Sequence, residues 1–167
     1  MRKTIEDHKH EIIEALVTAR SSVLRAVVSV PPERLHEVFL GVWSVQDLLA
    51  HLVGWDYTNL QAVQEILAGR YPTFFQNYDI DWQSYNARLV QEYKIEPFDL
   101  LVAKAADSHQ CLVSLLQSTP AGQLVKGKAR SEKGRTVTIR TLLQVEANDE
   151  RVHAEQVKAF LSSELRL

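Results

Sequence analysis

Apolar residues recur at steps of three, four and seven along almost the whole chain, which is the spacing of one face of an α-helix. The same spacing returns after Ser44, after Asp81, after Pro97 and from Ile139 onward. A β-strand would instead present alternate residues to one face. The pattern therefore predicts an all-α fold of long helices. In the first helix the apolar positions are Ile5, Ile12, Leu16, Ala19, Val23 and Val27.

Capping residues and prolines predict where these helices begin and end. Ser44 is typical of an N-cap, and Asp47 three residues later completes a capping box at the start of the second long helix. Similar signals are Pro31 and Pro32 after the first helix, Gly69 after the second, Asp81 before the third and Pro97 in the first turn of the fourth.

One segment interrupts the helical pattern before the last helix. Residues 126–139, "KGKARSEKGRTVTI", contain two glycines and a β-branched tail and indicate a loop or small hairpin. Its basic side chains either steer an anionic substrate or thiol cofactor, or are simply solvated. Long helices with short links predict an up-and-down four-helix bundle with this short basic loop or hairpin before the last helix.

The size and composition are those of one globular domain. The 167 residues, 46% of them hydrophobic, suit a single domain over residues 1–167. A net charge of -2 argues against nucleic acid as a partner, so none is expected. Cys111 is the only cysteine, so we expect no internal disulfide, a reducing compartment and an inert buried thiol. Without a signal peptide or an apolar run of ~20 residues, we expect a cytoplasmic protein with no membrane partner.

Polar residues fall on the apolar stripe of the last helix. Helical steps from Leu142 lead through Glu146, Asp149 and His153 to Val157, so the middle of an inward face is polar. An uncompensated buried charge costs several kcal/mol, in order of magnitude. Asp149 and His153 therefore need each other, another helix, water or a cation. The neighbouring Glu146 and Glu150 either support such a site or lie on the solvated surface.

His51 raises the same question on the second long helix, within "VWSVQDLLAHLVGW" (residues 42–55). An inward imidazole from one helix and an Asp/His pair from another can hold a metal in a bundle core. Three nitrogen and oxygen ligands leave positions open, as in catalytic zinc sites and in iron sites with two histidines and a carboxylate. The alternative is a hydrogen-bonded core histidine beside an Asp149–His153 pair worth a few tenths of a kcal/mol, in order of magnitude.

The motifs "VWSVQDLLAHLVGW" and "DERVHAEQVKAF" resemble the DinB-like (DinB/YfiT) superfamily of four-helix-bundle metalloenzymes. "DWQSYNARLVQEY" and "PFDLLVAKAADSHQCLVSLL" resemble its ClbS/DfsB branch. The resemblance implies an up-down-down-up bundle holding zinc, nickel or iron at His51, Asp149 and His153. The pair on the last helix is usually two histidines in this superfamily, and Asp149 stands in place of the first.

The resemblance also implies a function. It points to a metal-dependent enzyme that acts on a small electrophilic molecule, as a transferase or isomerase using a low-molecular-weight thiol, or as a detoxifying hydrolase. Glu146 or Tyr57 would then move protons near the metal. By the same resemblance, a cleft beside His51 would be lined by five aromatic side chains and one amide, although core packing is the better explanation of at least Trp43; the candidates are Trp43, Trp55, Tyr57, Trp82, Tyr85 and Asn86.

A function of another class competes with the enzyme. A bundle without metal could bind a small hydrophobic molecule, or only dimerise, without catalysis. In either case we expect a homodimer, because two-fold dimers are the commonest oligomers. Apolar residues near the predicted helix ends, Phe39, Phe74 and Phe75, are candidates for its interface.

Overall fold

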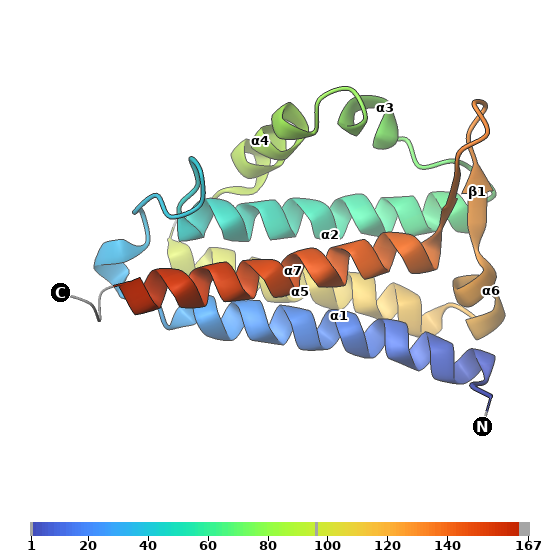
Figure 1. Ribbon diagram of the computed structural model, residues 1–167, viewed down its shortest axis with the longest axis horizontal. Coiled ribbons are helices and arrows are strands. Elements are labelled where there is room, and N and C mark those ends of the chain that lie inside the picture. The colour runs from blue at the N-terminus through green and yellow to red at the C-terminus, as the bar shows by residue number, and fades with distance from the viewer. Residues whose placement is uncertain (1, 96, 164–167) are drawn as a thin grey trace.

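The computed structural model describes residues 2–95 and 97–163, and four long helices dominate it (Figure 1). α1 and α7 run in one direction, and α2 and α5 run in the opposite one. The predicted four-helix bundle is therefore confirmed, in the up-down-down-up order. The four helices are α1 (Ile5–Val28), α2 (Val45–Leu67), α5 (Phe98–Ser118) and α7 (Ile139–Ser162).

The predicted caps define these helices. Asp47 N donates to Ser44 Oγ, and Ser44 N donates to an Asp47 carboxylate oxygen over 2.9 Å, which closes the capping box of α2. Gly69 follows α2 with φ +75°, a left-handed conformation that glycine adopts without strain. Asp81 caps α4 (Trp82–Tyr93) by accepting from Ser84 N. Pro97 is the N-cap of α5 rather than part of its first turn.

The links between the long helices contain short elements. The residue 126–139 segment is a hairpin, since β1 (Lys128–Arg130) pairs antiparallel with β2 (Thr136–Thr138), and Ala129 lies opposite Val137. The remaining links hold η1 (Pro32–Arg34), α3 (Phe75–Tyr78) and α6 (Ala121–Lys126), of which α3 and α6 were not predicted. Cys111 is exposed on α5, so the prediction of a buried thiol is wrong.

The apolar core has two halves. One half packs Leu16, Leu112 and Leu143 at the hairpin end, and the other packs Val23, Leu49 and Val157 at the opposite end. Between the two halves lies a layer of buried polar side chains from all four long helices. Its members are Arg20, Asp56, Asn59, Ser108, His109, Glu146 and Glu150.

α3 and α4 cross over α2 on the outside of the bundle (Figure 1). α4 approaches α2 closely at Gly54, where an added Cβ would lie 2.7 Å from Leu89 Cβ. A larger residue would have to push α4 outward, because this distance is well inside van der Waals contact. Gly54 therefore lets α4 lie directly on α2, one helical turn beyond His51.

The phenylalanines proposed for a dimer interface pack inside the chain. Phe75 is buried, and Phe39 and Phe74 are partly buried against the two core halves. Homodimer formation remains an expectation, but these side chains no longer support it. Among the described residues, no helix is long and apolar enough to cross a lipid bilayer.

His109 makes the stability of the bundle sensitive to acid. Burial, together with the charge of Arg20, lowers the pKa of His109 to about 3, although a hydrogen bond with the Leu16 backbone acts in the other direction. Between the ordinary pKa of about 6.5 and this lower value, only the unfolded chain binds the proton, so the free energy of unfolding falls as pH falls.

We predict that the free energy of unfolding decreases between pH 6.5 and pH 5 by about 1.5 kcal/mol less in His109→Gln than in the wild type. Glutamine is close to histidine in size and does not take up a proton in this range. Urea unfolding of wild type and variant at both pH values measures the difference. Parallel pH dependence in the two proteins would contradict the prediction.

Candidate metal centre

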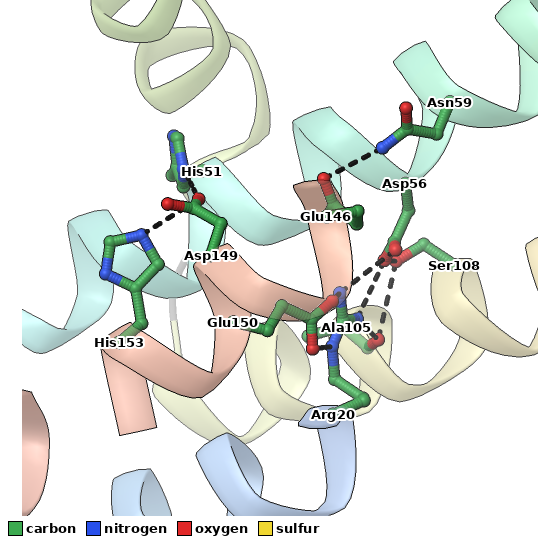
Figure 2. Close-up of polar contacts among 10 residues, drawn as sticks. All are labelled: Arg20, His51, Asp56, Asn59, Ala105, Ser108, Glu146, Asp149, Glu150 and His153. Carbon is green, nitrogen blue, oxygen red and sulfur yellow. Dashed lines mark hydrogen bonds and ion pairs between the residues drawn. The ribbon is translucent and has the colours of Figure 1, made fainter. Parts of the chain in front are cut away.

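His51, Asp149 and His153 meet where α2 faces α7 (Figure 2). Asp149 Oδ2 lies 3.7 Å from His51 Nε2 and 3.2 Å from His153 Nε2. All three candidate ligand atoms lie within 4.8 Å of one another. The three residues singled out from the sequence therefore converge at one place, because an i,i+4 pair on α7 projects toward the same point on α2.

His51 is buried without a hydrogen bond. Its side chain is 4% exposed, and neither ring nitrogen has a hydrogen-bond partner among the described residues. A buried polar group left without a partner costs about 1–3 kcal/mol. Trp43 packs against the ring, with 4.7 Å between ring centroids, and keeps that side free of water. The site therefore fits a cation, which would bind the orphaned Nε2 atom next to the Asp149 carboxylate.

Gln156 orients the second histidine. His153 Nδ1 lies 2.7 Å from Gln156 Oε1, and because an amide oxygen only accepts, Nδ1 is the donor. In the neutral ring, Nε2 then carries the lone pair and points toward Asp149. Fixing the tautomer through the second ring nitrogen is the usual way that proteins prepare a histidine ligand. Gln156 was not predicted from the sequence, although its position three residues after His153 places it one turn away.

Asp149 and the two histidines of the cluster shift one another's pKa values. Burial opposes protonation of His153, but the contact with Asp149 outweighs it and raises the pKa of this imidazole. Burial would raise the pKa of Asp149, yet the two histidines hold it well below its ordinary value. Burial lowers the pKa of His51, with Asp149 acting in the other direction. Asp149 is thus a carboxylate, and His51 is disposed to be a neutral imidazole, as metal ligands require.

The cluster forms the floor of a cleft of about 610 Å³. The volume falls within the range of small-molecule sites. One wall comes from Val42 and Trp43, before α2, and the other from Trp82 and Asn86 on α4. The side chain of Asp149 is 50% exposed, so the floor is open to solvent.

A second acidic group lies deeper in the bundle. Asp56, Glu146 and Glu150 also place carboxylate oxygens within 4.8 Å of one another. Arg20 lies among them, however: its guanidinium binds Asp56 over 2.8 Å and Glu150 over 2.6 Å, and it also donates to the Ala105 carbonyl (Figure 2). This group is therefore neutralised by an arginine and has no need of a metal.

The structure does not bring the two proposed proton carriers into the cleft. Glu146 is buried beside the arginine group, where it accepts from Asn59 Nδ2 over 2.9 Å. Burial and the nearby Glu150 raise the pKa of Glu146 well above its ordinary value. Tyr57 stacks on Tyr93 and lines a different cavity, on the far side of α4.

The family model of the DinB superfamily matches residues 15–157. The chain belongs to the DinB superfamily. No curated protein matches the sequence. The fold of this DinB-superfamily chain also recurs in solved structures of low sequence identity.

Three solved structures illustrate the fold. The colibactin self-resistance protein ClbS, in complex with double-stranded DNA, has a TM-score of 0.77 at 19% identity, over 90% of this chain and 93% of its own. An uncharacterised protein from Escherichia coli UTI89 has a TM-score of 0.76 at 16% identity, over 93% of this chain and 94% of its own. The mycothiol-dependent maleylpyruvate isomerase has a TM-score of 0.73 at 16% identity; 93% of this chain matches 63% of the isomerase.

The ClbS complex corrects one prediction. The exclusion of nucleic acid as a partner is wrong, because a protein with the same fold was crystallised with double-stranded DNA. The exclusion relied on the net charge of the whole chain, whereas phosphate contacts depend on local surface charge. The surface charge of this DinB-superfamily chain is unevenly distributed, since five basic side chains are exposed around the hairpin: Lys126, Lys128, Arg130, Lys133 and Arg135.

We predict that Arg20→Met lowers the free energy of unfolding by about 3–5 kcal/mol, because Asp56 and Glu150 lose the cation that compensates their burial. Arg25→Met, an exposed change on the same helix, should cost less than about 1 kcal/mol. Replacing the group together, as Arg20→Met with Asp56→Leu and Glu150→Met, should recover most of the loss. Urea denaturation measures all three, and equal effects of the two single variants would contradict the role of Arg20.

Proposed function

We propose that this protein is a metal-dependent enzyme that acts on a small electrophilic molecule. His51, Asp149 and His153 would hold a divalent cation at the floor of the cleft. The observation that carries the proposal is the buried His51 ring, whose nitrogens have no hydrogen-bond partner among the described residues while a carboxylate and a second imidazole lie beside it. A buried polar group in this state calls for a ligand.

The donor set supports zinc, nickel or iron. Two imidazoles and one carboxylate suit all three metals, and three ligands leave coordination positions open. When bound, the cation supplies Lewis-acid polarisation and acidifies water or a thiol near neutral pH. The chain itself orients the His153 ring through Gln156, excludes water from His51 through Trp43, and leaves Asp149 facing the solvent side of the cleft.

A low-molecular-weight thiol is the proposed cosubstrate. The shared fold with a mycothiol-dependent isomerase supports a thiol-dependent transferase or isomerase, and hydrolysis of the electrophile is the alternative when water takes the place of the thiol. We propose no role in proton transfer for Glu146 or Tyr57. Glu146 is buried beside Arg20, and Tyr57 lines a separate cavity. The competing function is a metal-free bundle that binds a small hydrophobic molecule in the same cleft.

We predict that the wild type, purified without a histidine tag, binds one zinc ion per chain, and that His51→Ala weakens binding by about a hundredfold or more. Loss of a direct ligand should exceed the 10–100-fold effect, in order of magnitude, of losing a residue that only orients one. Gln156→Leu should fall within that smaller range. Asp149→His should tighten zinc binding, since imidazole is the softer donor.

Competition titration against a chelator measures these affinities. His36→Ala is the matched control, because His36 is exposed and lies outside the cleft. If neither the wild type nor Asp149→His binds zinc more tightly than the His51→Ala variant, the metal-dependent function is excluded and the metal-free binding function replaces it.

A second prediction concerns the thiol. In protein loaded with cobalt(II), added cysteine methyl ester should produce a thiolate charge-transfer band in the near ultraviolet, because an open coordination position accepts the sulfur. The His51→Ala variant, treated in the same way, should give no band. A cobalt-loaded wild type whose spectrum does not respond to the thiol would leave hydrolysis as the proposed reaction.

A further inference from the structure

The described lining of the cleft above the candidate metal centre contains no arginine or lysine. Among the described residues that line it, Asp149 is the only one with a permanent charge, and the rest are apolar, histidine, hydroxyl or carboxamide. Proteins that bind carboxylates or phosphates usually provide arginine or lysine for them. The side chains of the lining by themselves therefore favour an uncharged molecule over an anionic one.

Trp55 fixes the orientation of Asn86. The indole Nε1 can only donate, and it donates to Asn86 Oδ1 over 3.0 Å. The Asn86 Nδ2 group consequently faces away from Trp55 and has no hydrogen-bond partner among residues 2–95 and 97–163. Asn86 is only 8% exposed and lines the cleft, so a nearly buried amide donor stands ready for an acceptor.

Gln156 provides a second donor in the same way. Its Oε1 atom accepts from His153 Nδ1, which leaves the Nε2 group as the free end of the amide. No described residue accepts a hydrogen bond from Nε2, and Gln156 also lines the cleft. Two carboxamide groups, oriented by two different neighbours, thus offer N–H donors to one cavity.

The walls of the cleft are flat and apolar. Trp43 stands on the His51 side, and Trp82 stands on α4 with 56% of its surface exposed. Val42 at the rim is 80% exposed. Exposed apolar side chains gathered at a cavity are typical of ligand sites, and indole rings favour flat partners.

We propose that the cleft selects an uncharged, flat molecule with carbonyl oxygens, such as an amide, imide or lactam. Asn86 and Gln156 donate to the carbonyl oxygens, and Trp43 and Trp82 cover the flat body. Asn86 is then a specificity-determining residue and Trp55 a positioning residue for it. The inference rests on the proposed function in placing a reactive electrophile at this site, but the recognition itself uses only side chains of this chain.

Three probes of similar shape separate these interactions: N-methylnaphthalimide, which is neutral with two carbonyl groups, acenaphthene, which has none, and the naphthoate anion. Quenching of tryptophan fluorescence measures the Kd of each. We expect the imide to bind at least about tenfold more tightly than either other probe. Asn86→Asp keeps an acceptor for Trp55 but replaces the donor, and should weaken imide binding at least about tenfold while leaving acenaphthene unchanged.

Gln110→Glu is the matched control, because it makes the same chemical change on the exposed face of α5 and should not alter any Kd. Asn86→Leu repeats the loss of the donor if the aspartate variant does not fold. Tighter binding of naphthoate or acenaphthene than of the imide, or equal effects of Asn86→Asp and Gln110→Glu, would overturn the proposal.

Repeating the titrations with chelator-treated and zinc-loaded protein separates the two proposals. Selective imide binding in a protein that takes up no zinc supports the carbonyl-binding cleft and excludes only the metal-dependent function. Zinc binding without selectivity among the probes overturns the present inference and leaves the metal site intact.

Discussion

The buried guanidinium of Arg20 is the interaction on which the bundle depends. It comes from α1, binds Asp56 of α2 and Glu150 of α7, and donates to the Ala105 carbonyl of α5. A charge of this kind is tolerated only when its partners have the correct geometry. These contacts form only when all four helices have one relative position along the bundle axis. They therefore fix the register of the helices, which apolar packing alone would leave less well defined.

The position of the candidate metal centre follows from that register. Glu150 is adjacent to Asp149 on α7, and Asp56 lies little more than one helical turn after His51 on α2. When Arg20 binds both Glu150 and Asp56, the preceding turn of α2 faces Asp149 and His153 (Figure 2). The interior group thus sets the alignment, and the outer group remains accessible from the cleft. Because Arg20 neutralises the interior carboxylates, they do not compete with the outer group of two histidines and one carboxylate for the same cation.

The fold and much of the candidate site could be predicted from the sequence, because they depend on local rules. Caps such as Ser44 with Asp47 act over three residues, and helical steps place His51, Asp149 and His153 on inward faces. The same steps should have excluded Tyr57, since six residues beyond His51 a helix presents a different face.

The long-range pairings were not predictable in this way. Arg20 lies four residues after Leu16, on the buried stripe, but nothing in its spacing identifies partners on three other helices. The orientation of Asn86 depends on Trp55, which is 31 positions away in sequence. Local spacing therefore locates the polar residues of a core, whereas their charges and donor directions follow only from how the helices pack.

The close approach of α4 to α2 at Gly54 means that the width of the cleft can change independently of the candidate metal ligands. Asn86 and Trp82 lie on α4, one and two turns before Leu89, whereas the three candidate ligands lie on α2 and α7. A substitution at residue 54 would lift the α4 wall, which holds Asn86 and Trp82, through Leu89 without moving the three candidate metal ligands. Residue 54 consequently controls the width of the cleft. A larger side chain there, in a natural homologue or an engineered variant, could admit bulkier molecules while the candidate metal ligands stay in place.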